Sequence, residues 1–341
     1  MKIISDIEKK EKEIFIFRIG NLGDSIVSIP ALLTIKNRHP NSKFTLITES
    51  YPNKKYVDSW SVLKHLGIFS RVRKYEKKIL NIFSLILFLR SHRKAFFYYL
   101  APHRDLKVIK RDKFFFTRLC GIKNIIGFDN LVDPESYIDK FGNFPRQEKE
   151  SNQLLRLINY SSENKYILKR PYFKPSKKDF EKVKKIIKVD KNKFNFLALG
   201  PGSNMISKKW PISRYAELIK RIIDYEKKIY ILLFGGKEDI LDAEDLILKT
   251  DGSRVTSLCG KTNIIESAAA LSLCEFYLGN DTGVMHLASA MGLDCISIFS
   301  SRANPGRWEP FGDKNIIHRK DGSHFGCELT DCKICQKELE K

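Results

Sequence analysis

The stretch Asn-Asp-Thr-Gly-Val-Met-His at residues 280–286 lies between two apolar segments. Residues 271–278 before it are mostly apolar, and residues 283–291 after it place apolar side chains at helical spacing. This pattern predicts a strand, a polar turn and a helix. In open α/β sheets, ligands bind at the carboxyl ends of strands, and a helix that starts there offers N–H groups to an anion. We therefore expect a phosphorylated ligand at this turn, unless Asp281 or Thr282 only caps the helix, which is worth about 1 kcal/mol.

Segments typical of strands and of helices alternate through most of the remaining chain. In the second half we expect further strands at 194–199, 229–234 and 254–258. Helices are expected at 213–225, 239–249 and 264–274. The first half begins in the same way, with strands at 14–18 and 43–48 and a helix at 25–38. Because such alternation is typical of parallel sheets covered by helices, we expect an α/β protein with two Rossmann-like, doubly wound domains that face a cleft.

The length of the chain also favours two domains. Its 341 residues exceed the usual size of one hydrophobic core, and 43% hydrophobic with 30% charged residues is a globular composition. Pro171 and Pro175 interrupt the alternation of strands and helices. We place the crossing between domains at residues 160–175, which gives an N-terminal domain over 1–165 and a C-terminal domain over 176–341.

The sequence contains no expected membrane span or signal peptide. A spanning helix needs about 20 apolar residues, and the longest apolar run, 79–89, is interrupted by Asn81 and Ser84. That run predicts a buried or surface-lying helix. Residues 1–13 are too highly charged for a signal peptide, so we expect the protein in the cytoplasm.

The formal net charge of +21 should attract anionic partners. Basic residues concentrate with aromatic residues between Arg90 and Arg118. This combination occurs where proteins bind nucleic acid, an anionic membrane or a phosphorylated acceptor, and it also fits an ordinary lysine-rich surface. The candidate contacts for an anionic acceptor are Arg90, Arg93, Arg104, Lys107, Lys110 and Arg111.

A second polar turn follows the first expected strand. Gly20 and Gly23 would let the backbone approach a ligand closely, and Asp24 would stand near the start of the next helix. The glycine spacing differs from the dinucleotide-binding pattern, so we expect no dinucleotide. Asp24 would either cap the helix or act as a general base toward an attacking hydroxyl, a role typically worth about 10² to 10⁴ in rate.

A third turn follows the strand expected at 194–199. It contains Ser203 and the pair Lys208 and Lys209, and a Trp-Pro sequence fixes its exit. A lysine ammonium beside the edge of a sheet suits a diphosphate, whose charge is costly to remove from water. The alternative is a pair of solvated surface lysines.

Seven cysteines are present. Four of them lie singly in apolar surroundings, as small buried thiols often do. The other three, Cys327, Cys332 and Cys335, form a C-x4-C-x2-C pattern close to His324. Because such spacing can hold zinc or iron, these three are candidate metal ligands, although we expect no required metal.

Three segments occur in an order that resembles a known family. They are Phe-Arg-Ile-Gly-Asn-Leu-Gly-Asp-Ser-Ile-Val-Ser-Ile-Pro-Ala-Leu at 17–32, Lys-Lys-Trp-Pro at 208–211 and Asp-Thr-Gly-Val-Met-His-Leu-Ala at 281–288. Together they resemble the family 9 glycosyltransferases, which include the bacterial heptosyltransferases of lipopolysaccharide core assembly. Trp308 and Pro310, followed by a cysteine-bearing tail, are similar to the C-terminal region of that family.

The resemblance implies a GT-B fold in which the N-terminal domain binds the acceptor and the C-terminal domain binds a nucleotide sugar. It also implies transfer with inversion and without a required metal or other cofactor. Asp24 matches the catalytic aspartate, and Lys208 matches the lysine that contacts the donor phosphates. The other donor-binding matches are Asp281, Thr282, Gly283 and His286, with looser matches at Gly235 and Glu238. For His286 the alternative to donor binding is a helix residue whose hydrogen bonds are satisfied by its surroundings.

We therefore expect transfer of a sugar, heptose from ADP-heptose in the first place, to a hydroxyl of a lipopolysaccharide core or a related anionic glycan or glycolipid. The enzyme would contact the cytoplasmic face of the inner membrane peripherally and bind no nucleic acid. One alternative is a protein O-heptosyltransferase, because some relatives that glycosylate proteins hold iron through a cysteine cluster. The other is a non-catalytic nucleic-acid-binding module that uses the net charge.

Overall fold

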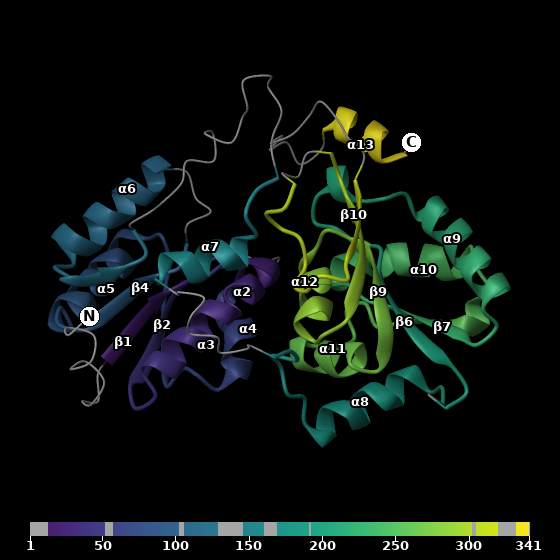
Figure 1. Ribbon diagram of the computed structural model, residues 1–341, viewed down its shortest axis with the longest axis horizontal. Helices are drawn as coiled ribbons and strands as arrows, with labels where there is room; N and C mark the ends of the chain where they lie inside the picture. The colour runs from purple at the N-terminus through teal and green to yellow at the C-terminus, as the bar shows by residue number, and fades with distance from the viewer. Residues whose placement is uncertain are drawn as a thin grey trace. The chain divides into compact units, whose positions relative to one another are not determined.

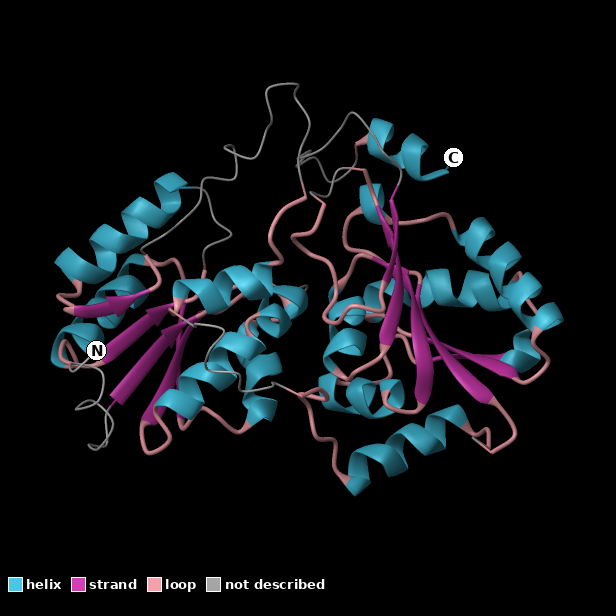
Figure 2. Cartoon of the chain, viewed as in Figure 1, coloured by secondary structure: helices cyan, strands magenta, loops and turns pink. Residues whose placement is uncertain are grey.

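The computed structural model describes residues 13–51, 57–101, 106–128, 146–159, 169–190, 192–301, 305–319 and 332–340. The chain divides into two compact units, Met1–Lys169 and Arg170–Lys341. Each unit contains one parallel sheet with helices packed against it (Figures 1 and 2). The α/β fold class with two Rossmann-like units, predicted from the alternation of strands and helices, is confirmed.

The first unit contains a five-stranded parallel sheet with the order β3-β2-β1-β4-β5. The central strand β1 pairs with β2 on one side and with β4 on the other, and its residues 14–17 are buried. Aromatic and β-branched side chains dominate β1, as expected for a strand that is covered on both faces. The strands are β1 Glu13–Phe17, β2 Lys43–Glu49, β3 Arg71–Tyr75, β4 Phe96–Tyr99 and β5 Asn124–Ile126.

The helical pattern expected at 25–38 forms two helices instead of one. Helix α2 covers Leu22–Val27 and α3 covers Ile29–Arg38. Pro30 explains the break, because proline has no N–H to donate to the preceding turn. The other helical segments of this unit are α4 Ser59–Leu63, η1 Lys64–Leu66, α5 Ile79–Ser91, α6 Leu106–Phe114, the π-helical η2 Phe115–Leu119 and α7 Glu150–Leu157.

Helices α5 and α6 lie on one face of the first sheet, and α3 and α7 lie on the other (Figure 1). Alternate side chains of β1 point to the two faces. Phe15 and Phe17 point to the α5 side, where they share a core cluster with Leu85, Leu89 and Phe116. The rings of Phe17 and Phe116 meet edge to face with their centroids 5.0 Å apart.

Helix α5 contains the apolar run that the sequence places at 79–89. It has 13 residues, and no helix in the described part of the chain has the length and apolar composition that crossing a bilayer requires. Leu85 and Leu89 are buried, whereas Ile79 and Leu80 are exposed. Of the two expectations for this run, the structure selects a surface-lying helix with one buried face.

The second unit contains a six-stranded parallel sheet with the order β11-β10-β9-β6-β7-β8. The strand expected from residue 271 begins only at Cys274. Leu271 instead completes α11, where the Ser272 N–H still bonds to the Ala268 oxygen. The strands are β6 Asn195–Gly200, β7 Ile229–Leu233, β8 Val255–Ser257, β9 Cys274–Asn280, β10 Asp294–Phe299 and β11 Ile316–Arg319.

Helices α9 and α10 cover one face of the second sheet, and α8, α11 and α12 lie on the other (Figure 1). Tyr215 of α9 and Leu246 of α10 share a core cluster with Leu197 and Leu199 of β6. Helix α13 packs against η4, the 3-10 turn that ends at Lys208. The helical segments are α8 Lys177–Ile187, η4 Ile206–Lys208, α9 Ile212–Tyr225, η5 Lys237–Asp239, α10 Ile240–Leu248, η6 Gly252–Arg254, α11 Ile264–Leu271, α12 Gly283–Ala290 and α13 Lys333–Glu340.

Each sheet has a topological switch point, where the strand order reverses its direction. It lies between β1 and β4 in the first unit and between β6 and β9 in the second. Loops that follow two such strands diverge, which leaves a crevice at the carboxyl edge where α/β proteins bind ligands. Asp24 follows β1, whereas Lys208 and Asp281 follow β6 and β9. All three polar turns of the sequence therefore lie at switch points.

Candidate functional site

Asp24 lies in the first turn of α2, directly after the turn that follows β1. Its Oδ2 accepts a hydrogen bond of 2.8 Å from the Asn21 N–H, so the side chain folds back over the turn. Gly20 permits this arrangement, because its φ is +123° and a Cβ there would lie 2.5 Å from the Asp24 Cβ. Asp24 remains partly exposed. The carboxylate therefore caps the helix and still reaches the surface of the switch point.

Arg18, the residue after β1, is fully buried beside Asp24. Its guanidinium donates hydrogen bonds to the backbone oxygens of Asp24 and Leu100, which joins α2 to the end of β4 across the switch point. Burial lowers the pKa of Arg18, and the charges of Asp24 and Glu150 oppose that shift. The sequence predicted no role for Arg18, although an arginine that directly follows an apolar strand is an available signal. Its contacts give it the role of positioning Asp24.

In the second unit, Lys208 and Asp281 form an ion pair although they are 73 residues apart in the chain. Lys208 Nζ lies 2.6 Å from Asp281 Oδ2. The Asp281 side chain is only 4% exposed, whereas that of Lys208 is 21% exposed. A buried carboxylate thus fixes an ammonium group that solvent can still reach. Two residues predicted to bind one ligand are brought together at the switch point.

Lys209 has a different partner. Its Nζ pairs with a carboxylate oxygen of Asp242 on α10, away from the turn that follows β9. The sequence alone left both lysines open as the cation of the site. The structure directs only Lys208 to Asp281.

Ser203 lies in the loop between β6 and η4 and is half-buried. Its Oγ accepts a hydrogen bond of 3.2 Å from the Met205 N–H. The hydroxyl therefore shapes the loop that leads to Lys208, while its proton can be donated to a ligand.

Helix α12 begins at Gly283, two residues after Asp281. Thr282 has extended backbone angles, φ −144° and ψ 173°, and its side chain makes no capping hydrogen bond to the helix. The first N–H groups of a helix have no partner inside the helix. In α12 these groups lie just after Thr282, close to the carboxyl end of β9. His286 is buried one turn later, with its ring centroid 6.4 Å from that of Trp308. The turn thus offers backbone N–H donors, and His286 is buried in the helix that follows them.

Asn280, the last residue of β9, connects the segments of this site through its side-chain amide. It is fully buried. Its Oδ1 accepts hydrogen bonds from the Tyr215 hydroxyl at 2.9 Å and from the Trp210 N–H at 3.2 Å. Its Nδ2 donates to the backbone oxygens of Pro201 at 2.7 Å and Gly202 at 3.2 Å. One amide therefore joins β9 to both ends of the loop that carries Lys208, a role that no pattern in the sequence specified.

Changing Asn280 to Ala should destabilise the fold by about 3 kcal/mol and weaken binding of the nucleotide that is predicted to contact Lys208, because several buried polar groups lose their partner. Urea unfolding measures the first effect and nucleotide titration the second. Asn315→Ala is the matched control, since Asn315 also bridges backbone groups, accepting from the Cys295 N–H and donating to Phe311 and Gly312. Equal loss of nucleotide affinity in both variants would refute a local role for Asn280.

The turn after β7 contains the two loosely matched residues, Gly235 and Glu238, which differ in burial. Gly235 is half-buried, whereas Glu238 is exposed in η5. The neighbouring Asp239, for which the sequence predicted no role, is buried and accepts a 2.8 Å hydrogen bond from the Gly236 N–H. Burial raises the pKa of Asp239. A Cβ at Gly202 would lie 2.0 Å from Asp239 Oδ1, so the loops after β6 and β7 close around this carboxyl group.

The structure divides the candidate acceptor contacts between two edges of the first sheet. Arg90 lies in the last turn of α5 and Arg93 follows the helix, close to Glu13 at the amino end of β1. Asp24 lies beyond the carboxyl end of the same strand. Arg90 and Arg93 are therefore separated from Asp24, and Arg104 lies outside the described residues. The three remaining candidates are exposed on α6, which begins at the carboxyl edge: Lys107, Lys110 and Arg111.

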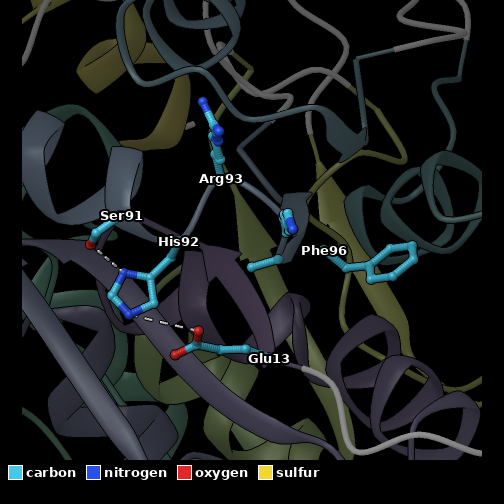
Figure 3. A pocket seen from close by; sticks show the side chains of 7 residues that line it. Glu13, Ser91, His92, Arg93 and Phe96 are labelled. Carbon is cyan, nitrogen blue, oxygen red and sulfur yellow. Dashed lines mark hydrogen bonds and ion pairs between the residues drawn. The ribbon is translucent and has the colours of Figure 1, made fainter.

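A hollow of about 540 Å³ lies beside Arg93 at the amino edge of the first sheet (Figure 3). His92 Nε2 is 3.7 Å from Glu13 Oε2 on its wall. Figure 3 shows Arg93 pointing away from this pair. Because β1 runs between this hollow and Asp24, the hollow is a feature separate from the polar turn.

Two of the three candidate metal ligands fall in the described part of the chain. Cys332 and Cys335 are buried at the start of α13, whereas Cys327 and His324 lie outside the described residues. Within the described ranges, no group of three or more His, Cys, Asp or Glu residues is placed to hold a metal. Metal binding by the cysteine pattern stays a prediction.

The chain is similar to known proteins in sequence and in fold. Residues 117–336 match the model of glycosyltransferase family 9 (heptosyltransferase). The lipooligosaccharide heptosyltransferase 2 of Campylobacter jejuni serotype O:6 is 25% identical over 349 aligned residues, which cover 96% of this chain and 95% of that protein.

Two solved structures share the fold. The Escherichia coli ADP-heptose lps heptosyltransferase II superposes with a TM-score of 0.68 at 17% identity, covering 92% of each chain. The E. coli heptosyltransferase WaaC with ADP superposes with a TM-score of 0.59 at 17% identity, covering 90% of this chain and 93% of that one. The match to the family model spans more than half of the sequence, and the fold is GT-B. The chain therefore belongs to glycosyltransferase family 9 and is a glycosyl-transferring enzyme.

Proposed function

We propose that this enzyme transfers heptose from ADP-heptose to a hydroxyl of a lipopolysaccharide core, with inversion and without a metal ion. The observation that carries the proposal is the Lys208–Asp281 pair at the switch point of the second sheet, directly beside the start of α12. The relatives are a lipooligosaccharide heptosyltransferase, an ADP-heptose lps heptosyltransferase and a heptosyltransferase with ADP. Their activities support heptose as the sugar, ADP as the nucleotide and lipopolysaccharide or lipooligosaccharide as the acceptor.

The leaving group sets the chemistry required of the donor site. When the bond between the anomeric carbon and the diphosphate oxygen breaks, negative charge grows on the departing ADP. The Lys208 ammonium and the first N–H groups of α12 are donors suited to that charge. Asp281 holds the ammonium in place, and Ser203 and Thr282 add hydroxyl groups beside it. The ammonium group and the helix N-terminus provide positive charge for the diphosphate, which supports a metal-independent reaction.

Asp24 supplies the base in this proposal. Its carboxylate accepts the proton of the acceptor hydroxyl while the hydroxyl oxygen attacks the anomeric carbon. The new glycosidic bond forms on the face opposite to the departing ADP, so one displacement inverts the configuration. No covalent enzyme intermediate is required. The bond from the Asn21 N–H fixes the orientation of the carboxylate.

The acceptor contacts are assigned to the first unit. Lys107, in the first turn of α6, is the candidate nearest to the edge that carries Asp24, because α6 starts at that edge. Lys110 and Arg111 follow along the same helix. An anionic glycolipid acceptor would also bring the enzyme into peripheral contact with the cytoplasmic face of the inner membrane.

Incubation with ADP-heptose and a heptose-deficient core acceptor tests the proposal. We expect ADP release that depends on the acceptor, and a product with inverted anomeric configuration by NMR. A thermal-shift series with ADP-, UDP-, GDP- and CMP-sugars should show stabilisation by the ADP-sugar, since a ligand that binds only the folded state stabilises it. Preferential binding of another nucleotide would overturn the donor assignment. Complete loss of turnover in EDTA, restored by one divalent metal, would overturn metal independence.

A further inference from the structure

Helix α5 carries large apolar side chains that are exposed and do not belong to the hydrophobic core of the first unit. Ile79 is 87% exposed, Leu80 82%, Phe83 59% and Leu87 53%. Ile79, Phe83 and Leu87 are four residues apart, so they form one row along the helix. Arg90 stands close to the end of the same row and is exposed. An apolar patch of this kind on a protein surface usually marks an interaction site.

Helix α6 carries a second row of a different character. Lys107, Lys110, Arg111 and Phe114 follow the spacing that places residues on one helical face, and all four are exposed. Ile109 and Asp112 occupy the opposite, buried side. Three cations thus precede Phe114 on the same helical face, and Phe114 is 58% exposed.

The two rows belong to one layer. Helix α5 and the segment formed by α6 and η2 pack against the same core cluster through Leu85, Leu89, Ile109 and Phe116. The charge of Arg90 also reaches Cys120, just after η2: burial raises the pKa of that thiol to about 12, and Arg90 opposes the shift. We call the exposed side of this layer the α5–α6 face; its residues are Ile79, Leu80, Phe83, Leu87, Arg90, Lys107, Lys110, Arg111, Phe114, Arg118 and Leu119.

The α5–α6 face has almost no negative charge. Residues 79–119 contain nine Lys and Arg and two Asp. Asp112 is buried and accepts a 3.0 Å hydrogen bond from the Tyr99 hydroxyl, and Asp105 lies outside the described residues. At the carboxyl end of α5, Arg93 and Lys94 extend the basic border along the hollow of Figure 3. The partner of this face must therefore accept apolar side chains and carry dense negative charge.

We propose that the α5–α6 face docks on a bilayer of anionic lipids, with the apolar row of α5 inserted among acyl chains and the cations of α6 against lipid phosphates. A helix that lies in the interface with an apolar side down and basic residues around it has this composition. The inference deepens the proposed function, because a glycolipid acceptor places the reaction at a membrane surface. It names the part of the chain that makes the contact.

Flotation of the full-length protein with vesicles tests this surface. We expect binding to vesicles of phosphatidylglycerol and phosphatidylcholine, little binding to phosphatidylcholine alone, and weaker binding as salt increases. Phe83→Ser with Leu87→Ser should weaken the partition about tenfold or more, because two inserted side chains are lost. The matched control is Leu241→Ser with Leu248→Ser on α10, which removes two side chains that are 78% and 84% exposed in the second unit.

Several outcomes would overturn the docking surface. The first is unchanged vesicle binding by the α5 variant, and the second is an equal loss in the α10 control. A third is that light scattering finds a dimer for the wild type and a monomer for the α5 variant. That result would make the face an interface between two copies of the chain. Thermal shift with ADP-heptose separates this proposal from the proposed function. The α5 variant should keep wild-type donor stabilisation, and absence of donor binding in every variant would defeat the proposed function alone.

Discussion

Asp24→Asn should lower turnover by a factor of about 10² to 10⁴ and leave donor affinity almost unchanged. The amide oxygen of Asn can still accept the bond from the Asn21 N–H, so the turn keeps its conformation. What the substitution removes is the ability to take a proton from the acceptor hydroxyl. Steady-state assays of ADP release and titration with the donor measure the two quantities separately.

Helix capping is the competing role of Asp24, and α8 provides a matched control for it. Asp179 occupies the same position in α8, where its Oδ2 accepts a 2.7 Å hydrogen bond from the Ser176 N–H. Asp179→Asn should therefore change stability about as much as Asp24→Asn, by about 1 kcal/mol or less, and leave turnover intact. If Asp24→Asn retains wild-type turnover, Asp24 is only a cap.

Lys208→Met should weaken donor affinity and lower kcat/KM together by a factor of about 10² to 10³, since the ammonium acts on the diphosphate in the ground state and in the transition state. It should also destabilise the protein by about 3 kcal/mol, because the Asp281 carboxylate is 4% exposed and would lose its cation. Calorimetric titration with ADP and urea unfolding check the two effects.

Two further variants separate binding from stability at this site. Lys208→Met combined with Asp281→Asn removes the buried charge, so stability should recover while ADP affinity stays low. Lys209→Met removes the neighbouring ammonium, which pairs with Asp242 at side-chain exposures of 24%, and it should leave ADP affinity near that of the wild type. Equal loss of ADP affinity in Lys208→Met and Lys209→Met would show that general positive charge, and not the Lys208–Asp281 geometry, attracts the donor.

Local patterns predicted most of the fold. Strands such as β7 Ile229–Leu233 and amphipathic helices such as α9 Ile212–Tyr225 are specified by the spacing of their own apolar residues. The errors occurred where local preference does not decide. Residues 271–278 are mostly apolar, and apolar residues fit the end of α11 and the start of β9 equally well. The helix at 25–38 was expected to continue through Pro30, although proline interrupts the ladder of backbone hydrogen bonds.

The site was predicted only in part for a related reason. Glycines, lysines and carboxylates at the ends of strands identify ligand turns, so the segments containing Asp24, Lys208 and Asp281 stood out. Because the chain belongs to an enzyme family, the alternative of a non-catalytic module is excluded. That the protein binds no nucleic acid stays a prediction. The supporting roles of Arg18, Asp239 and Asn280 were not predicted, because each acts through partners that are distant in the chain or belong to the backbone.

The sequence by itself determined two alternating α/β units with a polar turn after β1, β6 and β9, because strand and helix periodicity and turn composition are local properties of the chain. Only the tertiary structure decided which lysine meets Asp281, how one buried amide of Asn280 joins two loops, and that Arg90 and Arg93 lie at the edge opposite to Asp24. It also decided which side of α5 is left exposed. These outcomes depend on strand order and on packing between distant segments, which no local pattern contains.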